Sequence, residues 1–349
     1  MPLLGNSIYW GKYRFRLEQQ IARSLPSKWR ASLQDIHGDR RLDALLELSA
    51  PDGTSTEIAI EFKTEITPAT AEPAWRALTL AGQTGLLVAP QISPRTQRYL
   101  RDHDINYLDL AGNAFWRLDS PALFISINSD ADASKQKLFT RSRRLGGKKA
   151  GRLLRYLCDR RPPYSVSELA SNLALDPGNI SRYLDLLSKE ALIERGARGI
   201  VTSANWEGVL RRWSEDYRRP AEERFQDPHG MDHFLKKLRE GKEHYVLSGV
   251  IAATSYAPYT VANEALCYCA DIGLFAESLK LRRTERSSNV TLSIPFDEVV
   301  YARTEIRGGL IVGAPTQVAI DLLTGRGREL SQAEELLRWM RETESKWRE

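Results

Sequence analysis

The chain has 349 residues, of which 42% are hydrophobic and 27% charged, with three cysteines and a formal net charge of +5. This length predicts two or three domains, and the composition fits a soluble protein with well-formed cores. Three cysteines exclude a disulfide framework or a cysteine zinc site. No apolar run approaches the roughly 18 residues of a membrane span, and no signal-peptide core is present, so a cytoplasmic protein without a membrane partner is expected.

Residues 1–130 mix helical and strand patterns and are predicted to form the first domain. In chain order we expect a helix in "YRFRLEQQIARSL", a strand in "RRLDALLELS", a turn in "APDGTST" and a strand in "IAIEFKTE". A helix near residues 72–82, a strand "TGLLVAP", a helix "SPRTQRYLRDHD" and a strand "INYLDLAG" follow. The two strands that flank the turn are predicted to form a hairpin.

The register of this hairpin decides where its polar residues lie. Side chains alternate along a strand, so the apolar residues of both strands must share one face. Ala44 and Leu46 are therefore expected opposite members of the apolar set in residues 58–62, which places Asp43 on the face of Glu61 and Lys63. Two carboxylates and a lysine can hold Mg²⁺ and orient a water for phosphodiester attack. The alternative is a strand face that is merely solvated.

This order of elements resembles the PD-(D/E)xK, restriction-endonuclease-like fold. The resemblance implies that Asp43 and Glu61 are the acidic, metal-binding positions and that Lys63 is the basic catalytic position. It also makes Glu18, on the first helix, a candidate for the additional acid that some members carry. The E-x-K tripeptide occurs at two other places in the chain, so only Asp43 and the strand context give it weight. Many proteins keep this fold without cleaving DNA.

A second unusual string in this domain is "INYLDLAGNAFW", residues 105–116. Asn106, Asp109 and Asn113 are polar among apolar neighbours, and Gly112 permits a tight turn or a bulge. Both a structural corner and a ligand contact are open interpretations of this string.

Basic charge is concentrated in the middle of the chain, where residues 138–220 are predicted to form the second domain after a polar linker, Asn128–Lys137. Between Lys135 and Pro220, 19 Lys and Arg face 9 Asp and Glu, a net charge of +10, so the rest of the chain sums to −5. A basic middle between acidic flanks suggests contact with nucleic acid. The alternative is a solvated basic surface.

Residues 151–204 carry a clear local pattern. The string "GRLLRYLCD" predicts a first helix, and Ser165 with Glu168 has capping-box spacing for a second. "LDPG" interrupts the helical pattern, a further helix continues to Leu187, and "LIER", "GARG" and "IVTS" predict a two-stranded wing. This order resembles a winged helix-turn-helix of the transcription-regulator type.

The resemblance implies that the N-terminal part of the last helix enters the major groove of double-stranded DNA. Side chains there would read base edges, while the wing and flanking basic residues would position the protein on phosphates. The candidate DNA-binding residues are Ser165, Asn179, Ser181, Arg182, Lys189, Arg195, Arg198, Lys148 and Lys149, with Asp185 as a further candidate. A winged helix that contacts protein instead is the alternative.

Residues 231–349, the predicted third domain, begin with an apolar strand and a helix rich in small residues. Ser248 and Gly249 lie at this strand-to-helix junction, and Asp271 ends the next strand. The pattern resembles a nucleotidyltransferase-like α/β domain. Active members need a pair of acids near the junction, and here Asp271 is the one candidate, so a binding or scaffold role is expected. His229 and His233 are expected as solvated loop residues.

Taken together, the "YLDLAGN" string, the winged helix and the C-terminal pattern make the chain similar to AbiEi-like antitoxins of type IV toxin–antitoxin systems. The resemblance implies an α+β multidomain, sequence-specific DNA-binding regulator that represses its own operon and needs no cofactor to bind DNA. A cognate toxin or defence protein and a second copy of the chain are candidate partners. The central position of the winged helix departs from simpler members. The rival interpretations are a Mg²⁺-dependent DNA endonuclease targeted by its winged helix, and an accessory protein whose flanking domains bind protein.

Overall fold

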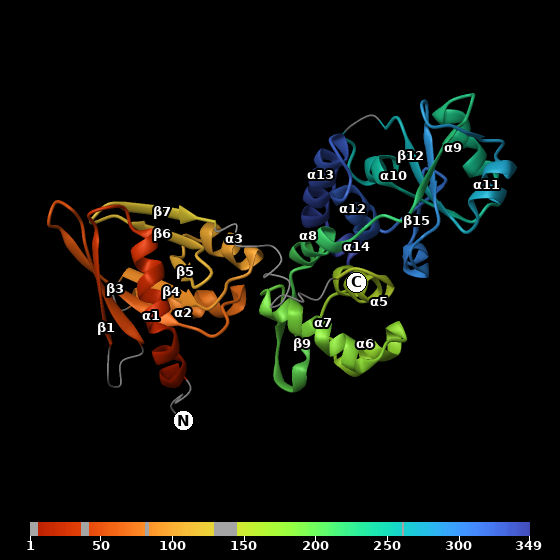
Figure 1. Ribbon diagram of the computed structural model, residues 1–349. Helices are drawn as coiled ribbons and strands as arrows, with labels where there is room; N and C mark the ends of the chain where they lie inside the picture. The colour runs from red at the N-terminus through yellow and green to blue at the C-terminus, as the bar shows by residue number, and fades with distance from the viewer. Residues whose placement is uncertain (1–5, 36–41, 81–83, 129–144, 260–261) are drawn as a thin grey trace. The chain divides into compact units, whose positions relative to one another are not determined.

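The computed structural model describes residues 6–35, 42–80, 84–128, 145–259 and 262–349 (Figure 1). Most of the expected linker, Asn128–Lys137, lies outside these residues. The chain is a mixed α and β protein that divides into two compact units, one built from residues before 143 and one from most of residues 143–349. We call them the N-terminal unit and the C-terminal unit. Within the described ranges, no helix is long and apolar enough to cross a membrane.

The N-terminal unit is a sheet whose strands follow chain order, β1-β2-β3-β4-β5-β6-β7. Strands β3, β4 and β5 are parallel to one another, and the outer pairs are antiparallel. The elements are α1 (Asn6–Ser24), β1 (Arg30–Asp35), β2 (Ala44–Ser49), β3 (Ser55–Phe62), α2 (Pro68–Leu80), β4 (Thr84–Ala89), α3 (Pro94–Asp102), β5 (Tyr107–Asp109), β6 (Ala114–Leu118) and β7 (Leu123–Ile127).

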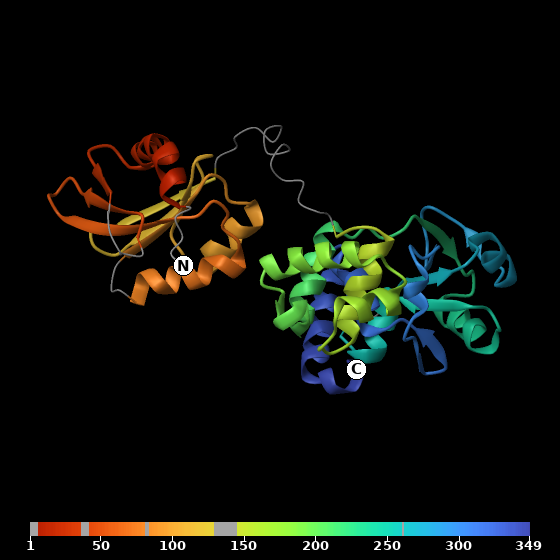
Figure 2. The same cartoon turned by 90° about the horizontal axis from the view of Figure 1, so that it is seen from below.

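The predicted hairpin register is confirmed, because Ala44 pairs with Ile60 and Leu46 with Ile58. Alternation then gives the sheet two apolar faces. One face packs against α1, and the other packs against α2 and α3 (Figure 2). Burial on both sides explains the nearly continuous apolar runs of β3 and β4, which lie in the middle of the sheet.

The C-terminal unit begins with a helical segment that has the element order expected from the sequence. It comprises α5 (Lys148–Asp159), α6 (Val166–Leu173), α7 (Pro177–Lys189), the hairpin β8 (Ile193–Arg195) and β9 (Val201–Ala204), and α8 (Trp206–Asp216). We call residues 145–204 the helix–hairpin segment. Tyr164 adds a bridge to Val201 beside the hairpin. Leucine spacing places Leu153, Leu157 and Leu184 in a fully buried core, as expected.

Local sequence explains where these helices begin. The Ser165 side chain accepts a hydrogen bond from the Glu168 backbone N–H at 3.1 Å and caps α6, as the spacing predicts. Pro177 and Gly178, expected to interrupt the helical pattern, are the first residues of α7. Proline suits this position because its fixed φ is helical and its missing N–H would have no partner there.

A second sheet, with strand order β13-β10-β14-β12-β11-β16-β15, forms the rest of the C-terminal unit. Its elements are β10 (Glu222–Gln226), α9 (Met231–Glu240), β11 (Tyr245–Ser248), α10 (Gly249–Tyr256), β12 (Ala265–Cys269), α11 (Ile272–Ser278), β13 (Arg282–Arg283), β14 (Val290–Ser293), β15 (Glu305–Arg307), β16 (Leu310–Val312), α12 (Pro315–Leu323), α13 (Arg328–Glu342) and α14 (Glu344–Trp347). Cys158, Cys267 and Cys269 are buried and unpaired, as expected of small core residues.

One continuous core runs through this unit, from Leu145 in the helix–hairpin segment to Trp347 in α14. Helix α12 packs against both α5 and α8, so the helix–hairpin segment rests on the second sheet's helices (Figure 1). Residues 138–220 and 231–349 therefore share a core where they are described, and their independence as separate domains stays a prediction.

Candidate functional site

The acidic face of the first hairpin lies where the register places it. Asp43 immediately precedes β2, and its backbone N–H donates to the Ile60 carbonyl at 3.0 Å. One carboxylate oxygen of Asp43 accepts from the Phe62 backbone N–H at 2.7 Å. Glu61 and Lys63 form an ion pair on this side of β3, and their side chains are 15% and 34% exposed. Asp43, Glu61 and Lys63 are thus gathered at the carboxyl end of β3.

The electrostatics of this face favour a cation. Burial raises the pKa of the Asp43 carboxyl, although the Phe62 N–H and the Lys63 charge oppose the shift. Burial also raises the pKa of Glu61, and the negative charge of Asp43 adds to this rise. Two carboxylates that repel each other in a partly dry site are stabilised by a shared positive ion. Lys63 supplies one such charge, and a divalent cation would supply a stronger one.

The donor chemistry fits Mg²⁺, which prefers carboxylate oxygens and retains several waters. Asp43 and Glu61 would be its protein ligands. Among the described residues, however, no group of three or more His, Cys, Asp or Glu side chains gathers in a way that could hold a metal ion. Glu18 does not complete the site, because α1 packs against the opposite face of the sheet, where Tyr13 stacks on Phe62.

The candidate DNA-reading residues lie on α7 with different exposures. Arg182 is exposed, while Asn179 and Ser181 are half-buried. The Arg182 guanidinium donates to the Gly178 carbonyl at 2.9 Å and to the side chain of Asn179. These contacts hold the Arg182 side chain along the first turns of α7. They are short-range and solvent-exposed, so a base edge or a phosphate can replace them.

The wing is tied to α7 by Arg195. Its guanidinium forms an ion pair with Asp185 on α7 and donates to the Gly199 carbonyl at 3.2 Å. Arg195 therefore orients the wing, and it is poorly placed to contact phosphate at the same time. Asp185 is likewise occupied by this ion pair. Arg198, by contrast, is exposed at the tip with φ +56°, in the left-handed region.

The remaining candidate DNA-binding residues have simpler placements. Ser165 serves as the cap of α6 and also lies 3.0 Å from the Ser167 hydroxyl. Lys148 and Lys149 are exposed in the first turn of α5, and Lys189 is exposed at the end of α7. The sequence brings Asn179, Ser181 and Arg182 together on one helix, whereas the two lysines of α5 belong to another.

Much of the basic charge of the middle segment is neutralised within the C-terminal unit. The ion pairs join basic residues of positions 145–220 to acids of positions 297–349: Arg152 to Asp297, Arg160 to Glu349, Arg211 to Glu334 and Arg219 to Glu329. The local excess of +10 therefore overstates the positive charge that this segment offers to DNA. Lys148, Lys149, Arg182 and Arg198 have no acidic partner among the described residues.

The "YLDLAGN" string has a structural explanation. The Asp109 carboxylate is fully buried and accepts hydrogen bonds from the backbone N–H groups of Ile92, Ala111 and Asn113 and from the Asn113 amide, at 2.9–3.1 Å. Burial raises the pKa of Asp109, and these donors oppose the shift. Gly112 takes φ +99° in the turn between β5 and β6. Of the two open interpretations, these contacts support the structural corner.

The acid expected near the Ser248–Gly249 junction lies elsewhere. Because β12 runs antiparallel to β11, Ser248 pairs with Leu266 at the start of β12, while Asp271 follows its far end. There Asp271 caps α11 by accepting from the Leu274 N–H at 2.9 Å. Asp271 is therefore not an acid of the junction.

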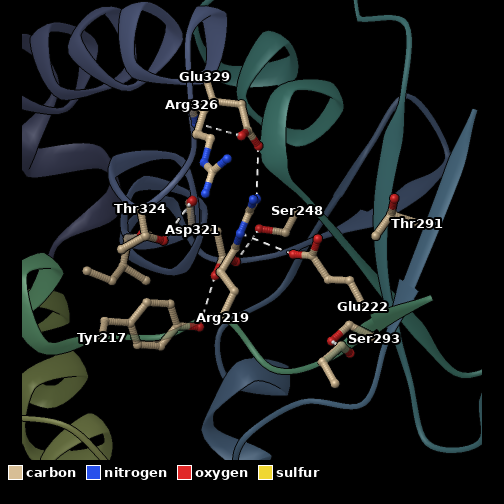
Figure 3. A network of polar contacts seen from close by, with 12 residues as sticks. Tyr217, Arg219, Glu222, Ser248, Thr291, Ser293, Asp321, Thr324, Arg326 and Glu329 are labelled. Atoms are coloured by element: carbon tan, nitrogen blue, oxygen red, sulfur yellow. Dashed lines mark hydrogen bonds and ion pairs between the residues drawn. The ribbon is translucent and has the colours of Figure 1, made fainter. Parts of the chain in front are cut away.

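The sequence interpretation missed the acid that does lie at the junction, Asp321 on α12. Its fully buried carboxylate accepts from Ser248 at 2.6 Å, from Tyr217 and Tyr268 at 3.0 Å and from Gln317 at 3.1 Å (Figure 3). Burial raises the pKa of Asp321. A lone acid in the apolar string "VAIDLL" is the sequence signal that points to such a network.

His233 is not a solvated loop residue, contrary to expectation. It lies on α9, and its ring nitrogen is 2.9 Å from the carboxylate of Asp227, which is buried. Lys237 reaches the same carboxylate at 3.2 Å, and the His229 backbone N–H donates to it at 2.9 Å. The His229 ring itself is exposed, as expected. This cluster anchors α9 to the loop that precedes it.

Comparison with protein-family models, with curated proteins and with solved structures found no match to this chain.

Proposed function

We propose that the protein is a sequence-specific, double-stranded DNA-binding transcriptional regulator of the AbiEi-like, winged helix-turn-helix kind. The observation that supports this function best is the helix–hairpin segment, in which α7 exposes Arg182 beside Asn179 and Ser181, and the wing exposes Arg198. Arg and Asn side chains pair with base edges in the major groove, and a wing-tip arginine suits a phosphate or the minor groove. In this proposal, the N-terminal unit is a restriction-endonuclease-like domain and the second sheet a nucleotidyltransferase-like domain.

The Arg182→Ala variant is expected to lose about 1–3 kcal/mol of specific binding free energy, because one bidentate base contact is removed. Affinity of the wild-type chain should also fall steeply as salt rises, since phosphate contacts release counterions. Mobility shifts of the full chain on the DNA upstream of its own gene, with an unrelated duplex as competitor, measure both effects.

A phosphate-contact variant provides the matched comparison. Arg198→Ala should weaken binding to specific and unrelated duplexes about equally and should reduce the salt slope by about one. Exposed Arg338, on α13 and far along the chain from α7, supplies a neutral control as Arg338→Gln. Absence of binding to any duplex at low salt would remove the proposed function.

A second candidate function is a Mg²⁺-dependent DNA endonuclease, supported by the convergence of Asp43, Glu61 and Lys63. Here the two carboxylates would hold the ion, which would activate a water, and Lys63 would stabilise charge that develops on the phosphate. Because both carboxyl pKa values are raised, each group is neutral over a wider acidic range. Cation affinity should therefore rise with pH through that range.

This candidate predicts that Mn²⁺ binding, measured by calorimetry, is lost in Glu61→Gln and that plasmid nicking falls at least about 100-fold in Lys63→Ala. Glu57→Gln is the control, because Glu57 lies on the same face of β3 and is exposed. Nicking at the same rate by wild type and Lys63→Ala would indicate a contaminating nuclease and exclude this function.

A further inference from the structure

A cavity of about 640 Å³ lies on one face of the second sheet, beside the start of α10. Pairing of Leu266 with Thr291, and of Thr291 with Arg224, places these three side chains in one row across the floor. The connection between α12 and α13 forms the opposite wall. Clefts of this volume suit small organic ligands. None of the residues assigned above to DNA or metal binding lines this cavity.

Four arginine side chains from separate parts of the chain line the cavity: Arg219, Arg224, Arg326 and Arg328. Arg219 is 22% exposed and is fixed by Glu222 at 3.1 Å and by Glu329 at 2.9 Å. The guanidinium groups of the other three arginines form no ion pair in the described ranges of the chain, although the Arg326 backbone N–H donates to Glu329 at 3.1 Å. The third lining acid, Glu264, accepts hydrogen bonds from the hydroxyls of Thr291 and Ser288.

The arrangement of the guanidinium groups points to a missing counter-charge. Figure 3 shows the side chains of Arg219 and Arg326 extending toward each other from opposite sides of the network. Guanidinium groups that line the same cavity repel each other, and an anion bound between them would offset this repulsion. The four arginines and three glutamates of the lining give a net charge of +1. Because Glu222 and Glu329 both pair with Arg219, and Glu264 accepts from hydroxyl groups, three guanidinium groups remain for a ligand.

We propose that this cavity binds a small molecule that carries two or more phosphate groups. Guanidinium groups bind phosphate oxygens through paired hydrogen bonds, and Arg224, Arg326 and Arg328 are available for this without breaking an ion pair. Arg219 would add a fourth, prepositioned donor. Val250 and Leu266 give the cavity an apolar side for the part of the ligand that carries no phosphate. The site does not depend on DNA binding by α7.

Calorimetric titration of the full chain with inorganic triphosphate, in EDTA, tests this site. We expect saturable binding at least tenfold tighter than that of inorganic phosphate. Arg224→Gln and Arg326→Gln should each weaken triphosphate binding at least tenfold, because each variant lacks one guanidinium group that would bind a phosphate. Both side chains are exposed, so the variants should keep the wild-type melting temperature.

Arg338→Gln is again the control, since Arg338 is exposed on α13 outside the cavity, and it should bind triphosphate like the wild type. Absence of binding, or equal loss in the control variant, would overturn the proposal. Tighter binding of a single-stranded oligonucleotide that displaces triphosphate and needs the same two arginines would also overturn it, because the ligand would then be nucleic acid.

Discussion

Replacing Arg155 with methionine is expected to lower the free energy of unfolding of the C-terminal unit by about 3–5 kcal/mol. Arg155 is fully buried on α5, where it donates to Asp159 at 3.0 Å, to Gln317 at 2.9 Å and to the carbonyls of Val299 and Ala302 at 3.3 Å. Removal of the guanidinium leaves the buried Asp159 carboxylate without its counter-charge. Urea unfolding and calorimetry of the full chain measure this decrease in the free energy of unfolding.

Arg160→Met is the matched control, because Arg160 follows α5, is exposed and reaches Glu349 only at 3.6 Å. A surface pair of this kind contributes at most about 1 kcal/mol. The double variant with Arg155→Met and Asp159→Leu should lose less than the sum of its single variants, since it leaves no unpaired charge. Similar losses in Arg155→Met and Arg160→Met would show that the buried pair does not hold α5 onto the unit.

Replacing Asp109 with alanine is expected to destabilise the N-terminal unit by about 3–4 kcal/mol, because it leaves buried donors without an acceptor. Three of these donors are backbone N–H groups, at Ile92, Ala111 and Asn113. They belong to the loop before α3 and to the β5–β6 turn, so the carboxylate joins these two connections. Calorimetry of the full chain should show the transition of one unit lowered and that of the other unchanged.

Asp102→Ala serves as its control, because Asp102 is an exposed acid at the end of α3 and its removal should change stability by less than about 0.5 kcal/mol. Asp109→Asn should fall between the two, since it keeps one acceptor oxygen and turns an amide toward donors. If Asp109→Ala has the melting temperature of the wild type, the "YLDLAGN" string is not a structural corner. A ligand contact would then be the favoured interpretation of this string.

The sequence predicted those features that depend on interactions between residues close together in the chain. Alternation in "IAIEFKTE" gave the hairpin register, and Ser165 gave the start of α6, because each depends on neighbours a few residues away. In the N-terminal unit, the strands β1, β6 and β7 were not predicted. The sequence "RASLQD" of β1 has few apolar residues, because this strand lies at the sheet edge. The β6 sequence "AFWRL" is mostly buried and so has weak alternation.

Features that depend on distant residues escaped prediction for the same reason. Asp321 meets Tyr217 and Ser248 only when three segments of the chain fold together. The pairing of arginines in the middle segment was not predicted, because the acids that pair with them lie about 110–190 residues further along the chain. The four arginines of the cavity are likewise far apart in sequence, and no spacing rule connects them.

The ion pairs between positions 145–220 and 297–349 make the acids of residues 297–349 internal counterions for the arginines of the middle segment. A fragment that ends near residue 220 would lack these acids. It would behave as a polycation, and the apolar side chains that pack against the rest of the C-terminal unit would be exposed. It would adsorb to any polyanion through counterion release, with little regard for base sequence. In the intact chain the same arginines are already paired. If the chain binds DNA as proposed, adsorption to bulk DNA should therefore be weaker than in the fragment, and exposed cations such as Arg182 and Arg198 should contribute most to binding.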